Sequence, residues 1–134
     1  MQTKKNHMVR FVLFSNGIVD LVAALALFFP VFKLPLPDYA SFTSELAFVA
    51  GGWGIAALTF GIGRIWTSYK PEFYWVMVTL GLIEGTILTA FCLINVFFLE
   101  VSLLQAILPL AVGSIYSFLY VLALRNLLRF GRPN

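Results

Sequence analysis

Two acidic residues, Asp20 and Glu84, each lie inside a long run of apolar residues. A charged group at the centre of a transmembrane helix costs roughly 2.5–3.5 kcal/mol, and such groups usually face the protein interior. Each acid stands the same number of residues from the start of its run, at Val9 or Phe73, roughly 16 Å deep at about 1.5 Å per residue. This equal depth favours a pair of carboxylates near the middle of the membrane.

A carboxylate pair across a cavity predicts a site for a cationic or polar ligand, or for proton exchange. The reason is that two nearby carboxylates in a low dielectric cannot both stay charged. Polar residues accompany both acids at helical spacing, a serine lies at similar depth in the fourth run, and one tryptophan is flanked by glycines. We therefore expect the ligand-binding residues to be Asp20, Glu84, Asn16, Ser114, Trp53 and Asn95.

Two other interpretations of the acids remain open. Each acid can be neutral and hydrogen-bonded to Asn16, Ser114, a tyrosine or the backbone, which would join helices without binding a ligand. Alternatively, one acid pairs with a basic group of another subunit. Arg10 and Arg64 are expected near the helix ends, too far along the axis for an easy salt bridge to a mid-membrane acid.

The composition favours an integral membrane protein. The chain has 134 residues, of which 60% are hydrophobic and 11% charged, with a mean hydropathy of +0.92. Soluble domains carry about 25% charged residues, so this chain has too few charges to cover a soluble surface. A soluble enzyme, a nucleic-acid binder and a disordered protein are excluded.

Four apolar runs are each near the ~20 residues that cross a bilayer as a helix. They cover residues 9–32, 46–65, 73–98 and 103–124. Prolines 30, 35 and 37 end the first run, and Ser102 with Gln105 forms a capping box before the fourth. We expect a single transmembrane domain over residues 1–134, folded as an all-α, antiparallel four-helix bundle.

Positive charge predicts the orientation of this bundle. Eight of the nine Lys and Arg residues fall in the N-terminus, the second connection and the C-terminal tail, and Lys33 alone falls in the first loop. Because cytoplasmic segments carry an excess of Lys and Arg, both termini should face the cytoplasm. The net charge of +3 then needs no nucleic acid as a partner.

Small residues recur on one face of the second run and predict close helix packing. This stripe contains Ala47, Ala50, Gly51, Gly54, Ala57 and Gly61, of which we assign Gly51, Gly54, Ala57 and Gly61 to helix packing. The fourth run has two candidate inner faces. One carries Ala111, Ser114 and Ser117, and the other carries Gln105, Pro109, Tyr116 and Tyr120. We favour the face of Ser114.

The sequence carries no motif of a known catalytic or metal site. His7 is the only histidine and Cys92 the only cysteine, so one chain cannot build a zinc, haem or iron–sulfur centre of the usual ligand sets. We expect no cofactor. An acid–base enzyme using Asp20 and Glu84 ranks third among the functions considered.

The chain resembles small bacterial inner-membrane proteins with four helices and no assigned activity. The resemblance rests on the stretch from Asn16 to Leu21 running on to Pro30, on the glycine-rich second run ending at Arg64, and on Gly81 to Gly85. It implies this architecture and a bacterial inner membrane. The layout is also loosely similar to small multidrug transporters, whose residue pattern is absent here.

The leading functional hypothesis is a protein that binds or transports a small polar, cationic or amphiphilic ligand at Asp20 and Glu84, with proton coupling as one form of it. The alternative is a structural or accessory subunit that binds lipid or a larger membrane complex. The expected partners are the lipid bilayer, a small-molecule or lipid ligand and further copies of the chain.

Overall fold

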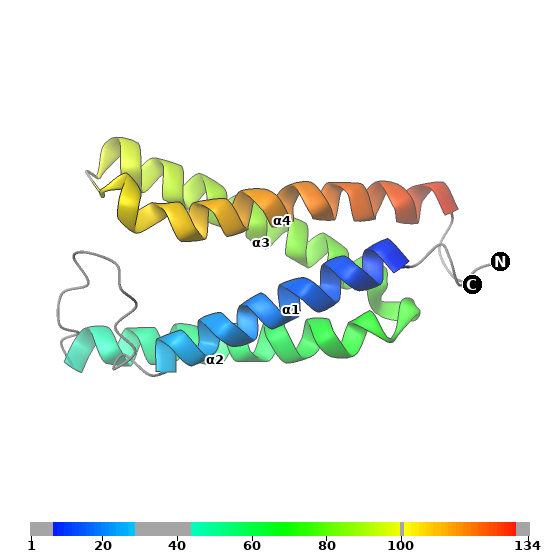
Figure 1. Cartoon of the computed structure of the whole chain (residues 1–134), viewed down its shortest axis with the longest axis horizontal. Helices are drawn as coiled ribbons and strands as arrows, with labels where there is room; N and C mark the ends of the chain where they lie inside the picture. Colours follow the sequence, from blue (N-terminus) through cyan, green and yellow to red (C-terminus); the bar gives the residue numbers. More distant parts are fainter. Residues whose placement is uncertain (1–6, 29–43, 100, 131–134) are drawn as a thin grey trace. The chain divides into compact units, whose positions relative to one another are not determined.

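The computed structural model describes residues 7–28, 44–99 and 101–130. Within these residues the chain forms four α-helices and one short 3-10 turn (Figure 1). In chain order they are α1 (His7–Phe28), α2 (Ser44–Ser68), η2 (Pro71–Phe73), α3 (Tyr74–Phe98) and α4 (Leu103–Phe130). All four α-helices are long and apolar enough to cross a membrane. The predicted all-helical fold with four candidate spans is confirmed.

The helix ends differ from the predicted ranges in a few places. α1 begins at His7, and its predicted end at residue 32, with the three prolines, lies outside the described residues. α2 continues to Ser68 and α4 to Phe130, since neither extension contains a proline or glycine that would end it. Pro71 and Glu72, expected to open the third helix, form the turn η2 instead.

The chain packs as two compact units, Phe14–Trp66 and Met1–Leu13 with Thr67–Asn134. In the unit Phe14–Trp66, α1 and α2 lie side by side (Figure 1). A Cβ added at Gly17 would lie 2.9 Å from the carbonyl oxygen of Gly61, and one at Gly54 would lie 3.2 Å from the Phe28 ring. Residue 17 of α1 therefore contacts residue 61 of α2, whereas residue 28 of α1 contacts residue 54 of α2. Because the contacts move toward the start of α2 as they move toward the end of α1, the two helices are antiparallel.

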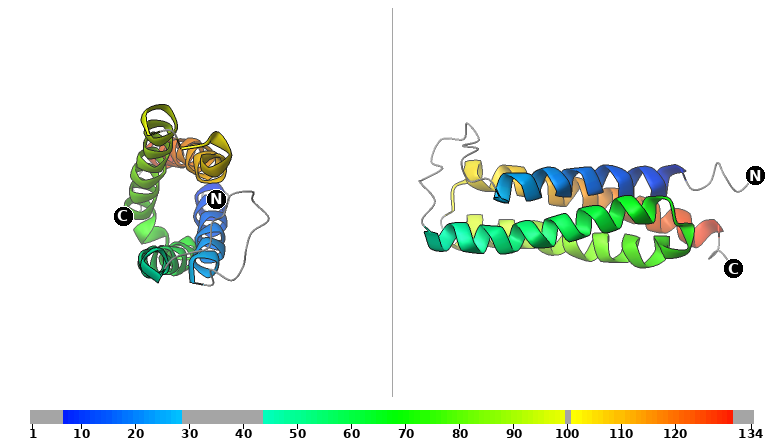
Figure 2. Two further views of the ribbon diagram at one scale, coloured as in Figure 1. Left: turned by 90° about the vertical axis from the view of Figure 1, so that its left-hand side faces the viewer. Right: turned by 90° about the horizontal axis from the view of Figure 1, so that it is seen from below.

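The other unit contains α3 and α4, which also run antiparallel and side by side (Figure 2). A Cβ added at Gly85 would lie 3.1 Å from the carbonyl oxygen of Gly113, and one at Gly81 would overlap the ring of Tyr120. Glycines on both helices therefore let the two backbones approach closely.

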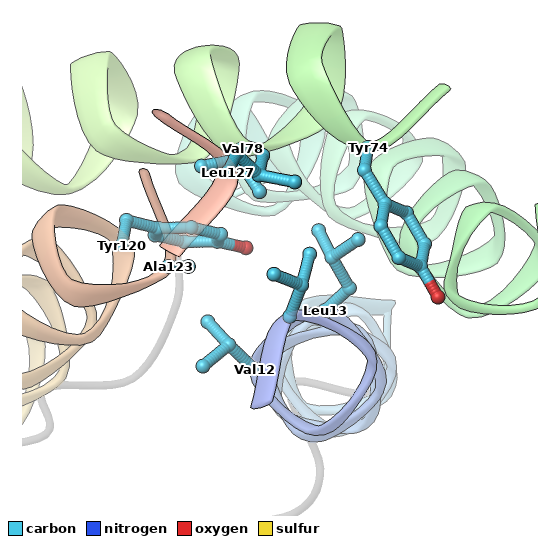
Figure 3. Packing of buried hydrophobic residues seen from close by; sticks show 8 residues of the cluster. Val12, Leu13, Tyr74, Val78, Tyr120, Ala123 and Leu127 are labelled. Atoms are coloured by element: carbon cyan, nitrogen blue, oxygen red, sulfur yellow. The ribbon is translucent and has the colours of Figure 1, made fainter. Parts of the chain in front are cut away.

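The core of this unit joins the first turns of α1 to the start of α3 and the end of α4 (Figure 3). The turn before α3 is closed by a hydrogen bond in which the Tyr74 hydroxyl donates to the Ser68 carbonyl at 2.8 Å. Because this hydroxyl has a partner, the ring can be buried with the aliphatic groups. The buried cluster consists of Val9, Val12, Leu13, Tyr74, Val78, Tyr120, Ala123 and Leu127.

Ser102 begins α4 as its N-cap. The Ser102 hydroxyl accepts a hydrogen bond from the backbone N–H of Gln105 at 3.3 Å, which is one half of the predicted capping box. α4 then continues through Pro109, which lies inside the helix.

Candidate functional site

An ion pair joins the two helices of the unit Phe14–Trp66. The guanidinium of Arg64 on α2 donates through Nη1 to the carboxylate oxygen Oδ2 of Asp20 on α1. The Arg64 side chain is 1% exposed and that of Asp20 is 15% exposed. The ring of Phe60 also faces the guanidinium, with its centroid 5.4 Å from the guanidinium carbon. A charged pair thus lies within the apolar helices, and its acidic partner keeps the greater access to the surroundings.

The small residues of α2 explain how the pair forms. Gly54 and Gly61 are both buried against α1, and Arg64 continues the same face three residues after Gly61. The close approach of Gly17 to Gly61 brings the two backbones together one helical turn from Asp20. A long side chain is then held against the facing helix instead of pointing away from it.

This pair corrects the expectation that Arg64 lies too far along the axis to reach a mid-membrane acid. α2 does not end at residue 65 but continues to Ser68, so Arg64 lies a full turn inside the helix. The helix register also sets Ile65 beside Gly17, which brings this part of α2 level with the part of α1 that carries Asp20. Separate depth counts from each predicted helix end could not give this register.

A buried amide accompanies the ion pair on α1. Asn16 is 5% exposed and lies one helical turn before Asp20, on the same side of the helix. The unit therefore brings an amide, a carboxylate and a guanidinium into its apolar interior. Together they supply hydrogen-bond donors and acceptors and both signs of charge, which suits recognition of a polar group.

The other four predicted ligand-binding residues are Trp53, Glu84, Ser114 and Asn95, and each is described within its own unit. Trp53 on α2 is 69% exposed, Glu84 on α3 and Ser114 on α4 are exposed, and the Asn95 amide donates to the Phe91 carbonyl of its own helix at 2.8 Å. Glu84, Asn95 and Ser114 belong to one unit, whereas Asn16, Asp20 and Trp53 belong to the other. The meeting of Asp20 with Glu84 stays a prediction.

The four residues assigned to helix packing have different surroundings. Gly54 and Gly61 lie against α1, and Ala57 between them is half-buried. Gly51 is half-buried, and a Cβ added there would meet no described heavy atom within 4 Å. Close packing of the two helices therefore centres on Gly54 and Gly61.

The buried face of α4 falls between the two faces considered from the sequence. Ser114 is exposed, and its neighbour Gly113 packs against Gly85 of α3. Ser117 also lies at this contact, where its buried hydroxyl has no hydrogen-bond partner among the described residues. The buried residues of α4 include Ala106, Gly113, Tyr120 and Leu127, which stand seven residues apart. This seven-residue spacing is the sequence signal that identifies the buried face of α4.

In the described residues, no three His, Cys, Asp or Glu side chains lie close enough together to bind a metal ion. Cys92 is a buried free thiol on α3.

The four candidate membrane spans, by their length and composition, indicate a multi-pass membrane protein, and two of them are joined by a buried ion pair. No protein-family model, curated protein or solved structure matches this chain. The resemblance to small bacterial inner-membrane proteins accordingly stays a prediction.

Proposed function

We propose that this protein binds or transports a small polar ligand within the membrane, with Asp20 as the carboxylate that receives the ligand's cationic group. The observation that carries the proposal is the Asp20–Arg64 ion pair. Intramembrane ionisable groups are rare and expensive, and they commonly mark substrate or ion pathways. The partial exposure of Asp20 gives a ligand a point of entry that Arg64 does not offer.

The ion pair favours a ligand that carries both a cationic group and an anionic or acceptor group. A cation that displaced Arg64 from Asp20 would leave a buried guanidinium without its carboxylate, which is strongly unfavourable. A ligand that carries both a cationic group and an anionic or acceptor group avoids this cost, since it satisfies Asp20 and Arg64 together. Asn16, one turn away, adds a neutral donor and acceptor.

The test compares three small probes, glycine betaine with both charges, choline with a cation only and acetate with an anion only. Thermal unfolding of the purified protein in a non-ionic detergent is followed with each probe. We expect betaine to raise the unfolding midpoint most, and Asp20→Asn to abolish the rise. Glu72→Gln, which changes an exposed acid in the η2 turn, should leave it intact.

Glu84→Gln tests the two-carboxylate form of the site. Loss of the betaine effect in this variant as well as in Asp20→Asn would support a paired site, whereas loss in Asp20→Asn alone assigns binding to the ion pair. Equal stabilisation of the parent and Asp20→Asn proteins would refute the proposal.

A structural or accessory role is the second candidate, favoured by the ion pair being complete within α1 and α2. Under this role none of the probes stabilises the parent protein, and a stoichiometric partner is recovered from native membranes. We also propose that the helices form an antiparallel four-helix bundle in the bacterial inner membrane, with both termini cytoplasmic and several copies assembled together. Four helices leave little interior for a site, which favours an oligomer.

A further inference from the structure

A basic and aromatic surface lies at one end of the unit that contains α3 and α4. The buried cluster brings together the first turns of α1, the start of α3 and the end of α4. The same three segments carry exposed basic residues, which are Arg10 in α1, Lys70 before α3, and Arg125 and Arg129 near the end of α4. Among the described residues 7–13, 67–74 and 120–130, Glu72 is the one acid, so this end carries a marked excess of positive charge.

One basic residue of this surface is held in a defined geometry. The guanidinium carbon of Arg10 lies 4.5 Å from the centroid of the Tyr69 ring, which is within the range of a cation–π contact. Both side chains are exposed, with Tyr69 56% exposed. A guanidinium that lies over a ring can still offer N–H donors to an acceptor beyond the ring.

From this geometry we propose that Arg10, Tyr69 and Lys70 form a binding site for the phosphate group of an anionic phospholipid. Arg10 donates two parallel hydrogen bonds to phosphate oxygens, a geometry that its planar fork favours. Lys70, next in sequence to Tyr69, adds a second positive charge. Tyr69 fits the level of the headgroups, where aromatic rings with a polar end are enriched.

A lipid is favoured over a soluble anion by the position of the site. Arg10 lies in the first turns of α1, and Tyr69 and Lys70 directly follow the end of α2. Both helices are candidate membrane spans, so the site lies where a span meets the headgroup layer. Phospholipid phosphates are concentrated in that layer, and basic side chains beside a span attract anionic lipids.

The experiment measures thermal unfolding of the whole protein in a non-ionic detergent with added lipid. Phosphatidylglycerol should raise the unfolding midpoint of the parent protein, and phosphatidylcholine at the same mole fraction should not. Arg10→Gln should lose more than half of this rise. Arg125→Gln, which removes one charge from the same end where the described residues show no ring over the guanidinium, should keep most of it.

The Tyr69 variants test the contact between Arg10 and the ring separately from charge. Tyr69→Phe should behave like the parent because the ring remains, and Tyr69→Ala should resemble Arg10→Gln. Since Arg10 is exposed and loses only its contact with the Tyr69 ring, Arg10→Gln without lipid should unfold in a single transition with a midpoint only slightly below that of the parent, which establishes that the variant is folded.

Three outcomes would overturn the proposal. Equal effects of the two lipids would remove the anionic specificity, and equal losses in Arg10→Gln and Arg125→Gln would mean diffuse attraction with no site. A full rise produced by inorganic phosphate alone would assign the site to a free anion.

Discussion

Arg64 occupies a position where an apolar or small residue would ordinarily stand. It is almost completely buried on the face of α2 that meets α1, and its charge is balanced by Asp20 and bordered by the ring of Phe60. A buried ion pair is weak evidence for stability, because both groups lose their hydration when they enter the interior. Once both charges are inside, however, removal of either one is costly for the other.

This argument gives a prediction for the ion pair. Asp20→Asn should lower the free energy of unfolding by about 3–5 kcal/mol, since it leaves the buried guanidinium of Arg64 uncompensated. Arg64→Gln should cost less, because Asp20 is the more exposed partner. The double variant should recover a large part of the loss. Unfolding of all four proteins in mixed micelles titrated with a denaturing detergent measures these energies.

The double variant also supplies the outcome that would contradict the prediction. If the two single losses simply add in the double variant, Asp20 and Arg64 are not energetically coupled.

At the scale of elements, both hairpins depend on small residues placed where two helices meet. Gly17 and Gly61 form the contact in the α1–α2 pair, and Gly85 and Gly113 form it in the α3–α4 pair. In both pairs the glycine backbones themselves are the surfaces in contact, so there is no room for a side chain. Each contact therefore fixes the register of its hairpin as well as its spacing.

Gly17→Ala should consequently destabilise the α1–α2 hairpin. The added Cβ would lie 2.7 Å from the Ile65 side chain and 2.9 Å from the Gly61 carbonyl oxygen, and the carbonyl belongs to the backbone and cannot rotate away. We expect a loss of about 1–3 kcal/mol, as for other overpacked contacts. Mixed-micelle unfolding gives the measurement.

Gly52→Ala is the matched control, because a Cβ there would meet no described heavy atom within 4 Å. It should leave stability unchanged or raise it slightly, since alanine favours the helix more than glycine does. Similar losses in the two variants would mean that the helices are weakened by the loss of glycine as such, and not by the contact.

The sequence predicts those features of the fold that depend on one segment alone, and it does not predict those that depend on how two helices meet. Span lengths and hydropathy are properties of one segment, so the four helices could be predicted, as could the importance of small residues on α2. The partner of Asp20 could not, because an ion pair depends on the register between two helices. One sequence feature does point to the pair. Arg64 stands three residues after Gly61, on the small-residue face of α2 that packs against α1. Prediction of the buried face of α4 requires the seven-residue repeat from Ala106 to Leu127, because sorting its residues into a small face and a polar face separates residues that are buried together.

At the scale of the whole molecule, charge and hydropathy divide the chain between bilayer and water. The exposed residues of the helices are predominantly large and apolar, which suits contact with lipid. The exposed basic residues of the described chain lie in the first turns of α1, in the turn before α3 and toward the end of α4. This distribution supports the proposed orientation with these segments in the cytoplasm.

Cysteine labelling tests the orientation. In a Cys92→Ser background, a cysteine placed at Lys70 should react with a membrane-impermeant maleimide only after the cells are permeabilised. A cysteine at Lys33, in the predicted first loop, should react in intact cells. The reverse pattern would show that the protein is inserted the other way round.

The length of α4 has a further consequence. The helix has 28 residues, so at about 1.5 Å per residue it extends about 42 Å, against a hydrocarbon core of ~30 Å. α4 must therefore either tilt or extend beyond the core at one or both ends. Hydrophobic mismatch of this kind changes with the host bilayer. The thickness of the membrane therefore sets how far Arg129, in the last turn of α4, stands from the surrounding headgroups.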